Sequence, residues 1–174
     1  MRAFNLLVST YRNREEDCIS ELWYLLRELG DEGAEAWRTV VPGLVAVKTG
    51  LDPFKASKRL GLMASERPWD FKYTLKLTPI EVVVPTSLDD IAKAAQGLAE
   101  RKIGSSDTYR VTVNKRATML RTSEVVEAVA SRISRKVNLK NPDWTVLVEI
   151  VGEDTGVSVV KQGDVVSIAK MLGR

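Results

Sequence analysis

The 174 residues include 26 Lys and Arg against 23 Asp and Glu, and 44% of them are hydrophobic, which is typical of a globular protein. One cysteine and no histidine exclude an internal disulfide, a Cys/His zinc site, and the Ser-His-Asp and Cys-His arrangements of nucleophilic enzymes. The sequence has no run of about 18 apolar residues and no signal-peptide pattern. We therefore expect a cytoplasmic protein with no membrane partner.

The first half of the chain predicts the element order β-α-β-β-α-β. Apolar or alternating runs predict strands over 3–9, 35–41, 44–49 and 71–84, and helical periodicity predicts helices over 15–29 and 53–67. Cys18 shares a helical face with three leucines, so we expect its thiol to be buried in a core. The element order is the split βαβ pattern of a ferredoxin-like domain, a fold that hosts many unrelated functions.

The second half predicts the order α-β-α-β-β-α. Ser87 caps its first helix, and Tyr109, Val111 and Val113 alternate on one face of the strand that follows. The remaining elements are predicted at 122–137 (helix), 145–151 and 157–161 (strands) and 163–173 (short helix). We therefore predict an α/β (α+β) fold with two domains, residues 1–85 and 86–174.

A basic corner joins the strand at Tyr109 to the helix that follows it. Lys115, Arg116 and Arg121 crowd this corner, and Thr122 or Ser123 is expected to cap the helix. Cations beside the free N–H groups of a helix start are a suitable site for phosphate. The alternative interpretation is an ordinary solvated loop that happens to be basic.

Positive charge is concentrated in the second half of the chain. Residues 1–100 have a net charge of −2, whereas residues 101–174 have a net charge of +5. We expect Arg132, Arg135 and Lys136 to share one helical face, with Lys140 and Lys161 nearby. Such a cluster favours a polyanionic partner, although an ordinary solvated face remains an alternative.

The low aromatic content indicates which polyanion would fit. Only 6% of residues are aromatic, which argues against a stacking platform for single strands. Duplex RNA is recognised mainly by its shape, phosphates and 2′-hydroxyl groups, so a basic domain with few aromatics suits it. We expect Trp144 to lie in a core, and Trp23, Trp37 and Trp69 to pack within the first domain.

The second half of the sequence resembles the THUMP domain of RNA-modification proteins over about residues 86–170. The resemblance rests on ordered features: Lys115-Arg116 at a strand end, Thr122-Ser123-Glu124 at a helix start, Val137-Asn138-Leu139, Asn141-Pro142-Asp143, Glu149 near a strand end, and Gly156-Val157-Ser158. THUMP domains typically follow a ferredoxin-like domain, and proteins with this pair bind the acceptor stem and 3′ end of tRNA. In most of them a third domain supplies the chemistry.

The chain ends at Arg174 without room for such a domain, so it most resembles the stand-alone branch of the family. That branch presents tRNA to a separate acetyltransferase that forms N4-acetylcytidine, and the segment Lys76–Glu81 is also similar to it. The resemblance implies an adaptor with no catalytic residues, no cofactor and no metal, whose partners are tRNA and an RNA acetyltransferase, and not DNA. The candidate RNA-binding residues are Lys115, Arg116, Arg121, Thr122, Ser123, Arg135, Lys136, Lys140 and Lys161.

Three alternatives remain open. The chain could serve another tRNA modification system, such as thiolation or methylation. It could be an enzyme whose carboxylates act in a cleft with a phosphate donor held at Lys115 and Arg116. It could also be a piece of a larger modification enzyme, although the initial Met and the complete last helix favour a whole protein. Asn141 and Asp143 are expected to form a turn and hold a loop, because a carboxylate repels phosphate.

Overall fold

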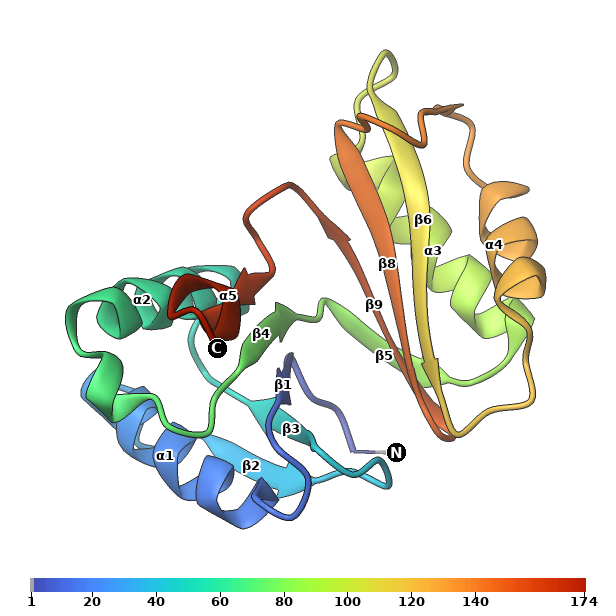
Figure 1. The fold of residues 1–174 in the computed structure, drawn as a ribbon. Helices are drawn as coiled ribbons and strands as arrows, with labels where there is room; N and C mark the ends of the chain where they lie inside the picture. Colours follow the sequence, from blue (N-terminus) through green and yellow to red (C-terminus); the bar gives the residue numbers. More distant parts are fainter. Residues whose placement is uncertain (1) are drawn as a thin grey trace. The chain divides into compact units, whose positions relative to one another are not determined.

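The computed structural model describes residues 2–174 and divides them into two compact units (Figure 1). The N-terminal unit comprises Ala3–Ile80 and Gly163–Arg174, and the second unit comprises Glu81–Gln162 with Arg2. Both units combine helices with a five-stranded sheet, so the predicted mixed α/β class is confirmed. No helix within residues 2–174 has both the length and the apolar character needed to cross a membrane.

The N-terminal unit is an antiparallel sheet with two crossover helices. Its sheet has the order β10-β4-β1-β3-β2, and the four strands β4-β1-β3-β2 with α1 and α2 form a split βαβ arrangement. The elements are β1 (Leu6–Ser9), α1 (Glu15–Glu28), β2 (Glu35–Arg38), β3 (Leu44–Lys48), α2 (Pro53–Glu66), the 3₁₀ turn η1 (Pro68–Asp70), β4 (Lys76–Pro79), β10 (Val166–Ser167) and α5 (Ile168–Met171).

Helical periodicity correctly located the core of the N-terminal unit. Cys18, Leu22 and Leu25 are fully buried on one face of α1 and pack against strands β1 and β3. Burial raises the pKa of the Cys18 thiol to about 12, so the group stays neutral at physiological pH and behaves as a small apolar side chain. The prediction that Cys18 lies in a core is therefore confirmed.

Two tryptophans of the N-terminal unit do not pack as predicted. Trp23 is 50% exposed on α1 and Trp69 is 65% exposed on η1. The ring of Trp23 lies 5.1 Å from the guanidinium carbon of Arg27, one helical turn away, so a cation–π contact accompanies its exposure. Trp37 is half-buried. The expectation of packing was therefore wrong for Trp23 and Trp69, which lie on the outer surfaces of their elements.

The second unit is a mixed sheet with both of its helices on one face. The sheet order is β5-β9-β8-β6-β7; β6 runs parallel to β7 and β8, and the other neighbours are antiparallel. Helices α3 and α4 cover the face that carries Tyr109, Val146 and Val157 (Figure 1). The elements are β5 (Val82–Pro85), α3 (Leu88–Lys102), β6 (Thr108–Arg116), α4 (Thr122–Ala130), β7 (Lys136–Val137), β8 (Trp144–Val151) and β9 (Asp154–Val160).

Helix α4 ends at Ala130, seven residues before the predicted end at Val137. Ile133 still reaches the core from the turn after the helix, whereas Lys136 and Val137 pair in parallel with Thr108 and Tyr109 as strand β7. Pairing with the free edge of β6 provides backbone hydrogen bonds that a longer helix would forgo. The expectation that Arg132, Arg135 and Lys136 share a helical face was therefore wrong.

The last twelve residues differ from the predicted domain of residues 86–174. They return to the N-terminal unit, where β10 pairs antiparallel with β4 through Val166 and Ser167. Ile168 is fully buried in the N-terminal core, and Arg174 donates a hydrogen bond to the carbonyl of Phe71. The predicted helix over 163–173 is shorter, because the pairing of β10 takes its first residues.

We expect Ile168→Ala to lower the free energy of unfolding of the N-terminal unit by about 2–4 kcal/mol, because it opens a cavity in that core. Hydrogen exchange should accelerate in β1, β3 and β4 and remain unchanged in β8 and β9. Val40→Ala is the control, since Val40 is 76% exposed in the same unit. Faster exchange confined to β8 and β9 would instead assign the last residues to the second unit.

Candidate nucleic-acid interface

The basic corner lies at the carboxyl end of β6, where the chain turns toward α4 (Figure 1). Lys115 is exposed, and its ammonium group donates to the carbonyl of Leu120 at 3.1 Å, which closes the turn over residues 116–120. Ala117 has a φ of +54°, a left-handed conformation that costs a residue with a Cβ roughly 1–2 kcal/mol. Contacts of the turn therefore fix a backbone shape that the sequence does not favour locally.

Helix α4 begins differently from the prediction. Arg121 occupies the N-cap position, and Thr122 and Ser123 are the first exposed residues of the helix. Because an arginine side chain has no acceptor, Glu124 reaches back and its carboxylate accepts the backbone N–H of Arg121 at 3.0 Å and its Nε–H at 3.3 Å. The first of these bonds lowers the pKa of Glu124 most. The expected cap by Thr122 or Ser123 was therefore wrong.

Arg116 differs from Lys115 and Arg121 in having a buried carboxylate as its partner. Its guanidinium nitrogen Nη1 lies 2.9 Å from Oε2 of Glu149, whose side chain is 3% exposed, and Asn114 donates to the other oxygen at 3.1 Å. The guanidinium of Arg116 therefore neutralises an internal charge. Its positive charge is less available to phosphate than those of Lys115 and Arg121, which is 77% exposed.

The other candidate residues lie at the opposite end of the same sheet. Lys136 is exposed on β7 and Lys140 is exposed on the loop that follows, and within residues 2–174 neither ammonium group forms a hydrogen bond or an ion pair. Arg135 is half-buried, and its Nε donates to the carbonyl of Ile103 at 3.0 Å. Lys161 is exposed just after β9 and lies 4.5 Å above the ring of Trp144.

Trp144 anchors this end of the sheet. Trp144 was predicted to lie in a core, and it packs against the core but is only half-buried. Its indole N–H donates to Asp107 at 3.1 Å. That bond is the main cause that lowers the pKa of Asp107. The exposed cation Lys161 therefore rests on a fixed aromatic surface, which limits its freedom and lessens the entropy lost on binding a ligand.

The structure places the nine candidate residues in two groups. We call Lys115, Arg116, Arg121, Thr122 and Ser123 the corner group, and Arg135, Lys136, Lys140 and Lys161 the β7 group. The nine-residue strand β6 separates them, which is about 26 Å at the usual rise of a strand. Both groups can contact one elongated ligand, but they do not form one pocket.

Sequence reasoning did not include Arg110 in the β7 group. Arg110 is exposed on β6, and its guanidinium donates to the carbonyl of Leu139 at 3.2 Å. The sequence could have predicted that Arg110 is exposed, because side chains alternate along a strand and Arg110 therefore lies on the face opposite the buried Tyr109. This contact fixes the loop that presents Lys140.

The turn at residues 138–143 has the structural role that was predicted for it. Oδ2 of Asp143 accepts the backbone N–H of Thr108 at 2.8 Å, and the N–H of Asp143 donates to the Thr108 hydroxyl at 3.1 Å. Oδ1 of Asn138 accepts the N–H groups of Lys140 and Asn141. The prediction that Asp143 holds a loop is confirmed, and this loop carries Lys140.

A family model described as the THUMP domain matches residues 85–160, which include α3, β6 and β8. The chain contains a THUMP domain. THUMP domains are RNA-binding modules of tRNA modification, which assigns the two basic groups, with the exception of Lys161 just beyond the match, to a domain of that class. A search of curated proteins gave no match.

Solved structures agree with this fold. The chain is similar to PH1313 from Pyrococcus horikoshii Ot3 at 19% identity, with a TM-score of 0.63 over 94% of this chain and 55% of that one. It is similar to TrmN from Thermus thermophilus at 20% identity, with a TM-score of 0.59 over 90% of this chain and 45% of that one. A 4-thiouridine synthetase, solved as an RNA complex with bound ATP, is 13% identical, with a TM-score of 0.54 over 95% of this chain and 42% of that one. The chain thus spans about half the length of these proteins.

We expect Arg116→Met to lower the free energy of unfolding by about 2–4 kcal/mol, because it leaves the carboxylate of Glu149 buried without its cation. The double variant Arg116→Met with Glu149→Leu should recover most of this loss. Lys136→Met is the matched control, since its side chain is exposed and its ammonium group forms no hydrogen bond or ion pair within residues 2–174. Urea unfolding of the four proteins checks the expectation. Equal stability of Arg116→Met and the parent would show that the buried pair contributes little.

Proposed function

We propose that this chain is an RNA-binding adaptor of tRNA modification, which holds tRNA on its THUMP domain and presents it to a separate enzyme. The observation that carries the proposal is a THUMP domain at residues 85–160 whose sheet has exposed cations at both ends. A-form RNA offers phosphates and 2′-hydroxyl groups along its length, so two basic groups on one rigid sheet suit it better than a single pocket does.

The strand order of the N-terminal unit supports the rest of the proposal. The strand order β4-β1-β3-β2 with two crossover helices supports our proposal that this unit is a ferredoxin-like domain. By its resemblance to proteins with this pair of domains, we propose that the chain binds the acceptor stem and 3′ end of tRNA. We also propose a cytoplasmic location, consistent with one buried, unreactive cysteine.

We propose an N4-acetylcytidine-forming acetyltransferase as the enzyme served, with no catalytic residue or cofactor in this chain. Two carboxylates of the second unit support this division of labour, because each has structural partners within the unit. Glu149 pairs with Arg116, and Glu81 accepts from Lys102 at 2.9 Å and from the N–H of Val159 at 2.8 Å. These two carboxylates therefore have a structural role in the fold.

A second candidate is a subunit or RNA-binding part of a thiolation or methylation system. It is favoured by the fold shared with the 4-thiouridine synthetase whose structure contains RNA. The adaptor and this alternative make the same prediction for RNA binding and differ in the enzyme that is stimulated.

We expect Lys115→Ala with Arg121→Ala to weaken tRNA binding by at least about tenfold at low salt, and to reduce the slope of log K against log salt by about one unit per lost phosphate contact. The control is Lys93→Ala with Arg101→Ala, which removes the same charge from exposed positions of α3. Fluorescence anisotropy with labelled tRNA across a salt series measures both effects. Equal weakening in the control would indicate a diffuse charge effect rather than a site.

A second titration tests the β7 group. Lys136→Ala with Lys140→Ala and Lys161→Ala should also weaken binding and flatten the salt slope, and combining it with the corner variant should give roughly additive losses, since the groups are about 26 Å apart. If the β7 variant binds tRNA as the parent does, the RNA contacts the corner alone. If neither variant changes binding, the THUMP surface that we assign is wrong.

The adaptor role predicts that the chain leaves tRNA chemically unchanged, yet increases its acetylation by the partner enzyme. An adaptor acts by raising the effective concentration of substrate at the enzyme. Unmodified tRNA, acetyl-CoA, ATP and the acetyltransferase are incubated with the chain, without it, or with the corner variant, and the nucleosides are measured by mass spectrometry. Equal acetylation in all three would remove the adaptor role, and a modified nucleoside formed by the chain alone would contradict a non-catalytic protein.

A further inference from the structure

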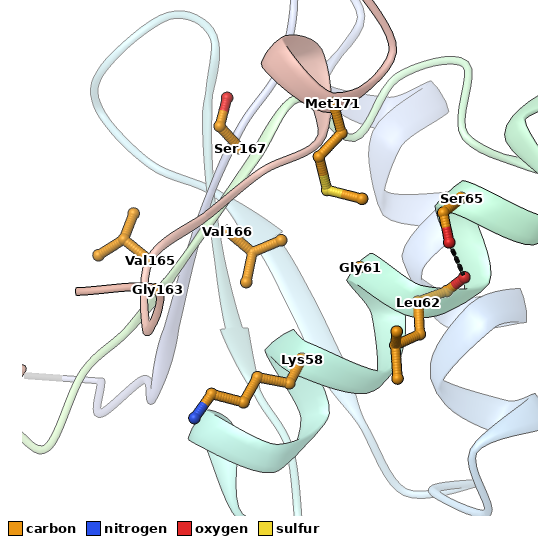
Figure 2. Close-up of a pocket in the computed structure, with 9 residues that line it drawn as sticks. All are labelled: Lys58, Gly61, Leu62, Ser65, Gly163, Val165, Val166, Ser167 and Met171. Atoms are coloured by element: carbon orange, nitrogen blue, oxygen red, sulfur yellow. Dashed lines mark hydrogen bonds between the residues drawn. The ribbon is translucent and has the colours of Figure 1, made fainter. Parts of the chain in front are cut away.

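The N-terminal unit carries an open apolar groove between α2 and the C-terminal segment (Figure 2). Its volume is about 530 Å³, and it is lined by Lys58, Gly61 and Leu62 of α2 and by Val165, Val166 and Met171. Figure 2 shows Val166, Leu62 and Met171 around the groove, with the ammonium group of Lys58 at one end. All these residues belong to one unit, so the groove depends on no contact between units.

Gly61 allows the two walls of the groove to approach. A Cβ at this position would lie 2.9 Å from Cγ1 of Val166, closer than real side chains come. The pairing of β10 with β4 holds Val166 there, and the buried Ile168 fixes the segment that follows. Strand pairing and core packing therefore fix the position of both walls of the groove.

The apolar side chains at the mouth of the groove are unusually exposed. Leu62 is 65% exposed and Met171 is 47% exposed, although both adjoin a well-packed core. Neighbouring exposed apolar side chains with a polar rim are typical of interaction sites. Methionine adapts its shape to different surfaces, which is why binding grooves for amphipathic helices often contain it.

The exposed surface of α2 next to the groove is basic. Lys55 and Arg59 are exposed three residues before the lining residues Lys58 and Leu62, about one helical turn away, and Lys170 is exposed and directly precedes Met171. Lys58 pairs with Asp164 at 3.2 Å, so much of its charge is neutralised within the chain and the outward positive charge comes from Lys55, Arg59 and Lys170. The exposed acids of this helix lie at its two ends, Asp52 at the N-cap and Glu66 at the last residue.

We propose that this groove binds an amphipathic helix of a partner protein, with apolar side chains on one face and carboxylates beside them. The apolar face would cover Leu62 and Met171, and the carboxylates would meet Lys55, Arg59 and Lys170. This docking surface lies outside the THUMP domain at residues 85–160, so the inference does not depend on the RNA-binding proposal.

The chemistry of the groove disfavours the other occupants. A small-molecule site usually has several converging polar groups, whereas this floor is made mainly of Val, Leu and Met side chains. Phosphates of RNA would pair with the rim but leave the apolar floor uncovered. A second copy of the chain would bring the same cations together across a two-fold axis, where they repel.

The test uses the full chain and a fluorescent synthetic helix with Leu at positions i, i+3, i+4 and i+7 and Glu on both flanks. A second peptide replaces every Glu with Lys. We expect the acidic peptide to bind and the basic one not to bind. Leu62→Asp and Met171→Asp should each weaken binding of the acidic peptide by at least about tenfold, since each places a charge in the apolar contact.

Val40→Asp is the control, because Val40 is 76% exposed in the same unit and lies outside the groove. Lys55→Glu with Arg59→Glu should weaken binding of the acidic peptide and allow the basic peptide to bind. A purely apolar site would not show this change in preference. Binding of neither peptide, or equal binding in Val40→Asp and Leu62→Asp, would overturn the proposal. Competition of the peptide by tRNA that depends on Leu62 would assign the groove to RNA, and a dimer in sedimentation that Leu62→Asp abolishes would assign it to self-association.

Discussion

The parallel pairing of β6 with β8 forms the centre of the sheet whose two ends carry the candidate RNA-binding residues. Eight register pairs, from Tyr109 with Trp144 to Arg116 with Val151, hold these strands side by side. In a parallel pair the N-terminal ends of both strands lie at one end of the sheet and their C-terminal ends lie at the opposite end. The pairing therefore places Trp144 beside the β7 group, and it places Glu149 beside Arg116 near the corner group. Tyr109, Val146 and Val148 lie on the face of the sheet opposite to Glu149 and Arg116, and they give α3 and α4 their packing surface.

The same pairing explains why charge and stability are linked at the corner. Glu149 is buried at a position where β6 presents Asn114 and Arg116, so its desolvation is offset by two hydrogen bonds from one neighbouring strand. Arg116 thereby stabilises the fold, while Lys115 and Arg121 remain exposed at the surface. Substitution of Arg116 would change both folding and RNA binding. Substitution of the exposed Lys115 or Arg121 leaves no buried charge unpaired, so its effect on RNA binding is easier to interpret.

Local patterns predicted most of the elements, and long-range pairing explains what they missed. The spacing of Val125, Val129, Ile133 and Val137 continues a helical face, yet the chain leaves the helix after Ala130 because the edge of β6 accepts β7. Two-residue strands such as β7 and β10 have no periodicity to detect. The sequence also did not predict that Trp23 and Trp69 are exposed, because an aromatic residue on a helix or turn can lie on the surface or in a core. The basic residues of the candidate site could be predicted from the sequence. Their division into two groups could not, because it depends on the length and direction of β6.

Photo-cross-linking of the chain to tRNA, with the linked peptides identified by mass spectrometry, tests directly whether the THUMP domain binds the RNA. We expect cross-links in the second unit, on peptides that contain the corner group or the β7 group. These cross-links should be lost when salt is raised, because they report contacts to phosphate. Cross-links confined to residues 3–80, with none in residues 81–162, would show that the THUMP domain of this chain is not its RNA-binding surface.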